Sequence, residues 1–162
     1  MKQEFSSQGA KLNGWIKIDH FDNNGNLVET VETPNALTNT GFAEVAGLFC
    51  SDEAASYTAF DYIAVGTGTT AATATDTELE AEETENGLTR AAATGTLVQV
   101  NVADDTAQFV KSFTVSGSVA VTESGVFNDA SAGTMLCRQT FSAINVADGD
   151  TLQITWKVTV AA

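Results

Sequence analysis

The stretch from Leu152 to Val160 constrains the fold of this chain more than any other part of the sequence. Apolar and polar residues alternate there without error over nine residues. Successive side chains of a strand point to opposite faces of a sheet, so all the apolar side chains fall on one face. That face consists of Leu152, Ile154, Trp156, Val158 and Val160. The pattern predicts a strand of an antiparallel sheet with one face in the core and the other in solvent.

Alternating patterns recur along most of the chain. Residues 12–31 predict a hairpin, with Ile16 and Ile18 on the inner face and a turn at Asn23-Asn24-Gly25-Asn26. Further strands are expected at 60–65, 98–102, 109–115, 119–126 and 135–141. Seven or eight strands separated by turns predict a mainly β fold, an antiparallel, jelly-roll-like β-sandwich.

One segment has the period of a helix instead. Phe42, Val45, Ala46 and Phe49 recur at helical spacing, which predicts a short α-helix over about Thr40–Phe49, capped by Asn39 or Thr40. The glycines within it lower its intrinsic stability by up to ~1 kcal/mol each relative to alanine. We therefore expect the apolar stripe to hold the helix by packing against a sheet.

The totals limit the partners of this chain. Its 162 residues, 43% of them hydrophobic, suffice for one domain with a sizeable core. A formal net charge of −14 argues against nucleic acid, which selects basic proteins, and equally against anionic membranes. The first ten residues lack the apolar core of a secretory signal, so we expect a soluble protein made in a cytoplasm. We divide the chain into an N-terminal arm, 1–10, and a single β-sandwich domain, 11–162.

The segment 71–86 is rich in alanine, threonine and acid. Its carboxylates are Asp76, Glu78, Glu80, Glu82, Glu83 and Glu85. Because burying so many unpaired carboxylates would be costly, the composition predicts a solvated connection.

No residue pattern indicates catalysis. His20 is the only histidine, and its neighbour Asp19 would point to the other face of a strand, so we expect a surface or hairpin histidine. No Ser-His-Asp triad can be completed elsewhere. The loop from Asp19 has Thr30 where a calcium loop needs a glutamate, which favours a turn. The sequence therefore predicts no enzyme, no cofactor and no metal site.

Two smaller features have ordinary explanations. Gly66-Thr67-Gly68 follows a strand, but the lysine and third glycine of a phosphate-binding loop are missing, so a glycine turn is expected. Cys50 and Cys137 lie far apart in the sequence. Their spacing leaves open whether they pair in a disulfide or remain two buried free thiols, of which we favour the thiols.

Three stretches, taken in order, resemble a group of small tailed-phage virion proteins: head decoration, head-fibre and tail-associated proteins. The first is 35–42, beginning Asn-Ala-Leu-Thr-Asn. The second is 60–79 with its Ile-Ala-Val-Gly-Thr-Gly-Thr motif, followed by Arg90. The third runs from Glu123-Ser-Gly-Val-Phe to Trp156 and contains Asp148-Gly-Asp. The resemblance covers roughly residues 35–160.

The resemblance implies a virion structural protein. The leading expectation is a capsid decoration (cement) protein, a homotrimer on the outer capsid surface that binds the major capsid protein and is assembled in the host cytoplasm. The alternative is a tail or fibre component that binds the host surface, with carbohydrate as a candidate ligand. A small hydrolase acting on envelope polysaccharide is disfavoured, because the acids cluster on a segment expected to be solvated.

Two sets of residues are candidates for these contacts. Lys2, Gln3, Glu4 and Phe5 would form an intersubunit arm that adds to a neighbour's sheet, with terminal disorder as an equal alternative. Tyr57, Phe60 and Tyr62 are the candidate surface-binding aromatics, although packing in the core or an interface is the favoured explanation for them.

Overall fold

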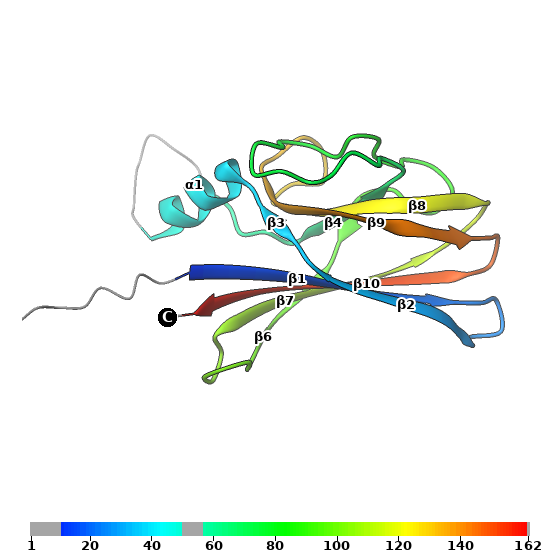
Figure 1. Cartoon of the computed structure of the whole chain (residues 1–162), viewed down its shortest axis with the longest axis horizontal. Coiled ribbons are helices and arrows are strands. Elements are labelled where there is room, and N and C mark those ends of the chain that lie inside the picture. The colour runs from blue at the N-terminus through cyan, green and yellow to red at the C-terminus, as the bar shows by residue number, and fades with distance from the viewer. Residues whose placement is uncertain (1–10, 50–56, 162) are drawn as a thin grey trace, which may run out of the picture.

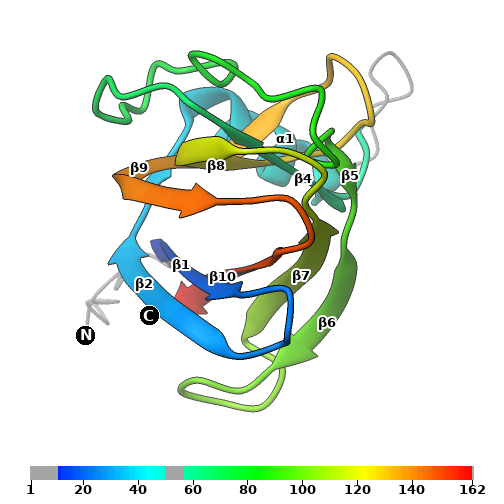
Figure 2. The same ribbon diagram turned by 90° about the vertical axis from the view of Figure 1, so that its right-hand side faces the viewer.

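The computed structural model describes residues 11–49 and 57–161, which form two antiparallel five-stranded sheets packed face to face (Figures 1 and 2). Sheet A has the order β2 (Leu27–Pro34), β1 (Lys11–Phe21), β10 (Thr151–Ala161), β7 (Thr106–Thr114), β6 (Thr94–Val98). Sheet B has the order β3 (Ala36–Leu37), β9 (Met135–Val146), β8 (Val119–Phe127), β4 (Tyr62–Gly66), β5 (Ala91–Ala92). The one helix in these residues, α1, spans Asn39–Leu48. The predicted mainly β sandwich with one short helix is confirmed.

The chain passes between the sheets after β2, β5, β7 and β9. The predicted hairpin is β1–β2, with its turn at Asp22–Asn26. The proposed arm at 1–10, with Lys2, Gln3, Glu4 and Phe5, lies outside the described residues.

The main core lies between the two sheets, and β10 is at the centre of sheet A. Its inward residues Leu152, Ile154 and Trp156 are fully buried, as the alternation predicted. Val160, which continues the same face, is half exposed because it reaches the end of the sandwich. The register of β10 against β1 runs unbroken from Lys11↔Ala161 to Phe21↔Thr151.

The helix packs mainly on a different face from the one predicted, although Val45 of the predicted stripe does pack against the main core. Its buried residues are Gly41, Glu44 and Gly47, whereas Phe42 and Phe49 are exposed. Gly41 lies so close to β9 that a Cβ there would stand 2.6 Å from the carbonyl oxygen of Leu136. The glycine face therefore allows a close approach that the apolar stripe would block. The cap also lies one residue earlier than expected, since Thr38 Oγ1 accepts a 2.9 Å hydrogen bond from the Gly41 N–H.

The predicted strand over 98–102 is wrong beyond Val98, where β6 ends. The carboxylate of Asp105 accepts hydrogen bonds from the backbone N–H groups of Val100, Asn101 and Val102. These bonds draw the backbone into a turn, and the pKa of Asp105 is lowered by them. The alternating valines Val100 and Val102 are left exposed.

The acidic segment passes over the outer face of sheet B (Figure 1). Leu79 from this segment is buried against Ala64, Phe127 and Met135, which point away from the main core. A second, smaller core therefore forms outside sheet B, and β8 is covered on both faces along most of its length. Most of this segment is exposed, as predicted, but it also contributes one buried side chain and covers strand residues, which the prediction missed.

Candidate functional site

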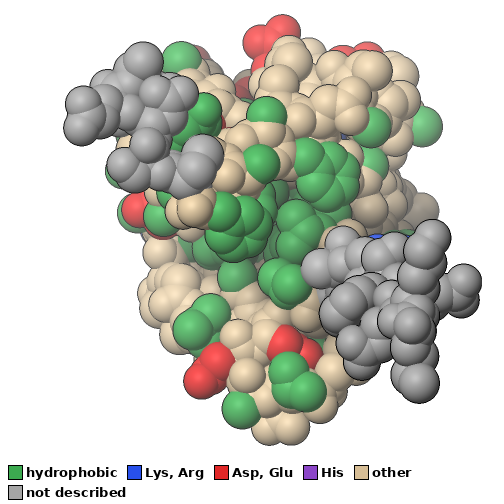
Figure 3. All heavy atoms as spheres, turned by 90° about the vertical axis from the view of Figure 1, so that its left-hand side faces the viewer, with side chains coloured by type: hydrophobic (Ala, Val, Ile, Leu, Met, Phe, Trp, Pro, Cys, Tyr) green, Lys and Arg blue, Asp and Glu red, His purple; other side chains and the backbone are tan. Residues whose placement is uncertain are grey.

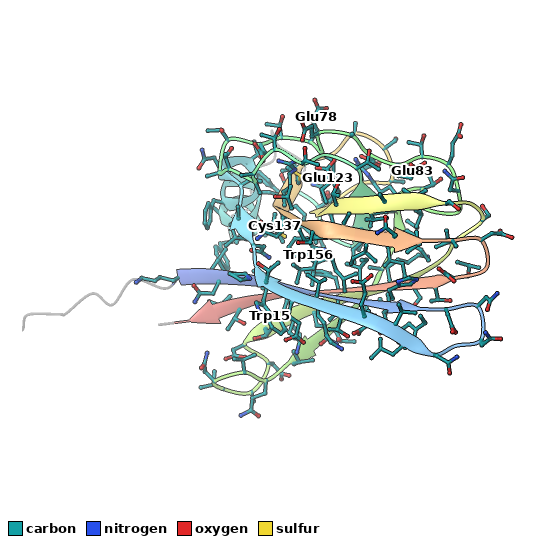
Figure 4. All side chains as sticks on the ribbon, turned by 45° about the vertical axis from the view of Figure 1, so that its right-hand side comes forward. Trp15, Glu78, Glu83, Glu123, Cys137 and Trp156 are labelled. Atoms are coloured by element: carbon teal, nitrogen blue, oxygen red, sulfur yellow. The ribbon has the colours of Figure 1, made fainter. Side chains whose placement is uncertain are left out.

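A buried glutamate, Glu123, lies at the centre of the contact between sheet B and the acidic segment (Figure 4). The register of β8 against β9 shifts between Val121 and Glu123. At this irregularity two steps along β8 oppose four steps along β9, and the side-chain alternation of β8 is reversed. Val121 consequently faces the main core, whereas Glu123 faces outward, beneath the acidic segment.

The carboxylate of Glu123 binds the backbone of the acidic segment. It accepts hydrogen bonds from the N–H groups of Gly68 at 3.0 Å, Glu80 at 3.1 Å and Ala81 at 2.7 Å. A Cβ at Gly68 would lie 2.5 Å from Glu123 Oε1, and one at Gly66 would lie 2.4 Å from the carbonyl oxygen of Ala81. The glycines of the predicted glycine turn therefore make room for the carboxylate and for the segment.

Arg138 on β9 neutralises this glutamate. Its Nε donates a 2.8 Å hydrogen bond to Glu123 Oε2, and its Nη1 donates one of 2.8 Å to Asp76 Oδ2. Nη2 lies 2.7 Å from Glu123 Oε2 but out of line for a hydrogen bond, so that contact is ionic. Burial would lower the pKa of Arg138, but the hydrogen bonds and charges of Asp76 and Glu123 outweigh burial and raise it. We call Asp76, Glu123 and Arg138 the carboxylate–arginine cluster.

A second arginine holds the segment further along. Arg90 donates from Nε to Glu82 Oε1 at 3.0 Å and pairs through Nη2 with Glu82 Oε2 at 2.5 Å. Its guanidinium lies 3.5 Å from the centre of the Phe127 ring, a cation–π contact. Two buried arginines thus fix acids that the sequence interpretation assigned to solvent. The spacing of the acids gave no signal of the first pairing, because Arg138 lies 62 residues from Asp76, whereas Arg90 lies only eight residues beyond Glu82.

His20 lies in the β1–β2 hairpin, which was one of its two expected positions, but its side chain is buried and not on the surface. Its Nε2 lies 2.9 Å from Asp150 Oδ2, and its Nδ1 lies 3.5 Å from Glu29 Oε1. The hydrogen bond with His20, aided by the backbone N–H of Ala147, lowers the pKa of Asp150. The partner of His20 is therefore Asp150 rather than a neighbour in sequence. The hydrogen bond between them joins the β1–β2 hairpin to the turn before β10.

The remaining polar groups weighed in the sequence have structural positions. Asp22 closes the hairpin turn by accepting hydrogen bonds from the N–H groups of Asn24 and Asn26. Cys137 is a buried free thiol whose pKa is raised by burial, and Cys50 lies outside the described residues. Within 11–49 and 57–161, no three His, Cys, Asp or Glu side chains gather closely enough to hold a metal ion.

The three candidate aromatics do not form one exposed group. Phe60 is buried in the main core between the sheets, so the favoured explanation of core packing is confirmed for it and its alternative assignment as a surface-binding residue is wrong. Tyr62 is half-buried against the smaller core, and Tyr57 is half-buried at α1, where a Cβ on Gly47 would collide with its ring. A binding role for the two tyrosines stays a prediction.

The apolar stripe of α1 instead borders an open groove at one end of the sandwich. The groove has a volume of about 500 Å³ and includes the first residues of β1 and the end of β10. Its apolar lining is Leu12, Phe42, Val45, Ala46, Phe49 and Val160. We call this surface the helix-end groove; Figure 3 shows apolar side chains gathered on that end of the molecule.

The fold and these sites define a class of protein: an acidic β-sandwich with a carboxylate–arginine cluster beneath a surface segment and an apolar groove open to solvent. No family model, curated protein or solved structure matches this chain. No helix in the described part of the chain is long and apolar enough to cross a membrane.

Proposed function

We propose that this chain is a non-enzymatic virion structural protein that decorates the capsid of a tailed virus and stabilises its shell. One observation carries the proposal: the three stretches that resemble phage virion proteins meet at shared contacts. Asp76 of the second stretch binds Arg138 of the third. Thr38 of the first stretch donates its hydroxyl to the Met135 carbonyl oxygen of the third. The resemblance is thus carried by residues that hold the fold together.

The physical properties of the molecule suit this role. A subunit on a particle surface needs a stiff body, and the carboxylate–arginine cluster fixes a long connection that would otherwise move. It also needs to stay soluble at high local concentration, and a net charge of −14 provides mutual repulsion between freely diffusing copies. In this proposal the partners are the major capsid protein and further copies of the chain in a homotrimer on the outer capsid surface.

Copy number on purified particles tests the proposal. An antibody raised against the chain would identify particles that contain it, and quantitative mass spectrometry would give its ratio to the major capsid protein. A decoration protein should be present at hundreds of copies per particle, and its removal should lower the temperature at which the shell releases its genome. A handful of copies would contradict a shell-wide role.

The tail or fibre alternative makes a different prediction. Binding to host cells or to a glycan array, lost in Tyr57→Ala and kept in Trp15→Ala, would favour it over decoration. Trp15 is a suitable control because it is a partly exposed aromatic residue on β1 of sheet A, whereas Tyr57 packs against α1.

A further inference from the structure

The helix-end groove leaves apolar side chains of several elements in solvent. Phe49 is 84% exposed and Val160 is 52% exposed. The ring of Phe49 projects from the same surface that the groove hollows out. When one surface carries both a projecting ring and an apolar groove, the ring of one copy can enter the groove of a second copy that is related to the first by a symmetry axis. We infer that the helix-end groove of this chain binds the helix-end surface of a second copy.

The charges around the groove support a second copy as the occupant. Two molecules that each carry −14 repel, so they can associate only through surfaces where carboxylates are sparse. Among the residues that the structure describes, no carboxylate lines the groove, and the one charged residue there is Lys11. The groove is therefore a surface at which two acidic copies can approach closely.

Charges of opposite sign lie on either side of the apolar centre. In sheet A, β10 lies between β1, which begins at Lys11, and β7. On the β7 side, the N–H of Val160 donates to the carbonyl oxygen of Asp105, and the neighbouring Asp104 is exposed. If a second copy is related to the first by an axis beside the helix-end groove, Lys11 of one copy can lie near Asp104 of the next. The same head-to-tail arrangement can close into a ring of three.

Sedimentation velocity of the full chain tests this inference between about 1 µM and 1 mM, the range of moderate to weak affinities. The wild-type protein should sediment as an oligomer whose population grows with concentration. Phe49→Asp should raise its dissociation constant at least about 30-fold, because an apolar side chain central to an interface contributes at hot-spot level. Phe42→Ser should have a smaller effect in the same direction.

Leu27→Asp is the matched control. Leu27 is 56% exposed, and its β1–β2 hairpin lies at the opposite end of the sandwich from α1 (Figure 1). The Leu27→Asp substitution adds the same charge in place of an exposed apolar side chain. Because it lies far from the helix-end groove, it should leave the association unchanged. Thermal unfolding of each variant would verify that the fold is kept, which Phe49→Asp should satisfy because the replaced ring is largely in solvent.

A wild-type protein that stays monomeric across the range would overturn the inference, and so would an oligomer that tolerates Phe49→Asp. A dimer broken by Phe49→Asp would support the groove as the contact and contradict the homotrimer of the proposed function. The inference does not depend on a place in a virion, so a low copy number on particles would leave it intact.

Discussion

At the scale of individual residues, Glu123 connects parts of the fold that lie far apart in the sequence. It accepts hydrogen bonds from two backbone N–H groups of the acidic segment and from the Gly68 N–H of the glycine turn, and it is itself paired with Arg138. Charges are retained in a protein interior only where hydrogen bonds and counter-charges satisfy them. Here both conditions hold, so the glutamate links a strand of sheet B to a connection remote in sequence.

Replacing Glu123 by alanine should therefore be severe. The change leaves the Arg138 charge without its closest partner and removes the acceptor of three backbone N–H groups, for an expected loss of about 3–5 kcal/mol of unfolding free energy. Urea unfolding followed by tryptophan fluorescence measures this loss. Glu78→Gln, which changes an exposed acid of the same segment, should stay within about 0.5 kcal/mol of the wild type. Equal effects of the two changes would contradict the role given to Glu123.

Asp76 should contribute to the acid sensitivity of the fold. Burial alone would raise its pKa, but hydrogen bonds from the Thr73 backbone and from Arg138 outweigh burial and lower it below the ordinary value. A group with a lowered folded pKa stabilises the protein above its unfolded pKa, and this contribution is lost as the pH falls through the folded value. Asp76→Asn should thus be less stable than wild type at pH 7, with the gap narrowing towards about pH 2.

Urea midpoints of both proteins at several pH values would measure that gap. Other carboxylates with lowered pKa values, such as Asp150 and Asp22, are present in both proteins, so their contributions cancel in the comparison. A gap that is constant with pH would show that Asp76 acts by packing and not by charge.

Of the secondary-structure elements, α1 is the one whose role differs most from expectation. Helical spacing correctly located it to within about one residue at each end. The same spacing assigned the wrong face to the core, because apolarity is a signal for burial only where the neighbouring backbone leaves room for side chains. At β9 it leaves room only for glycine, as the approach of Gly41 to Leu136 demonstrates.

Gly41→Ala tests this account directly. Helix propensity alone predicts a gain of about 1 kcal/mol, since alanine favours helices over glycine by that amount. The new Cβ would meet the Leu136 backbone at 2.6 Å, however, and overpacking of this kind costs about 1–3 kcal/mol. We expect net destabilisation in chemical denaturation.

The control for that experiment is Ala43→Gly, at an exposed position of the same helix. It should lose roughly 1 kcal/mol through propensity alone. Stabilisation by Gly41→Ala would contradict the close packing of α1 on β9.

How far the sequence predicts this protein depends on the range of the interactions involved. The strands were predictable because residues such as Ile16 and Trp156 alternate locally, and a period of two needs no knowledge of distant partners. The burial of Glu123 could not be predicted, because it depends on a bulge that turns the side chain outward and on an arginine from another strand. The partner of His20 lies 130 residues away and was missed for the same reason.

The protein as a single body carries a large unbalanced charge. Seven Lys and Arg residues face 21 acids, and even the paired acids of the acidic segment leave many carboxylates in solvent. Such charges repel one another within a compact molecule and destabilise it relative to the expanded chain. Long-range repulsion is screened once the Debye length falls to about 3 Å near 1 M salt, whereas buried pairs are screened much less.

Salt should therefore stabilise this protein. We expect the thermal unfolding midpoint to rise between about 10 mM and 1 M sodium chloride, because screening relieves repulsion more than it weakens the buried ion pairs. Differential scanning calorimetry at neutral pH would measure the shift. A midpoint that falls with salt would show that favourable surface pairs outweigh the net charge.

The position of β10 has a consequence for how the molecule comes to be built. It lies between β1 and β7 in sheet A. The first strand to be synthesised, β1, can therefore pair along its whole length only after β10 has been made. During synthesis, which proceeds at about 5–20 residues per second, β1 and β7 must wait with open edges for seconds while the intervening chain is made. Closure then requires contacts between residues far apart in sequence, and folding dominated by such contacts takes milliseconds to seconds. The nascent chain is thus most exposed to chaperones, and to mispairing with its neighbours, just before β10 is made.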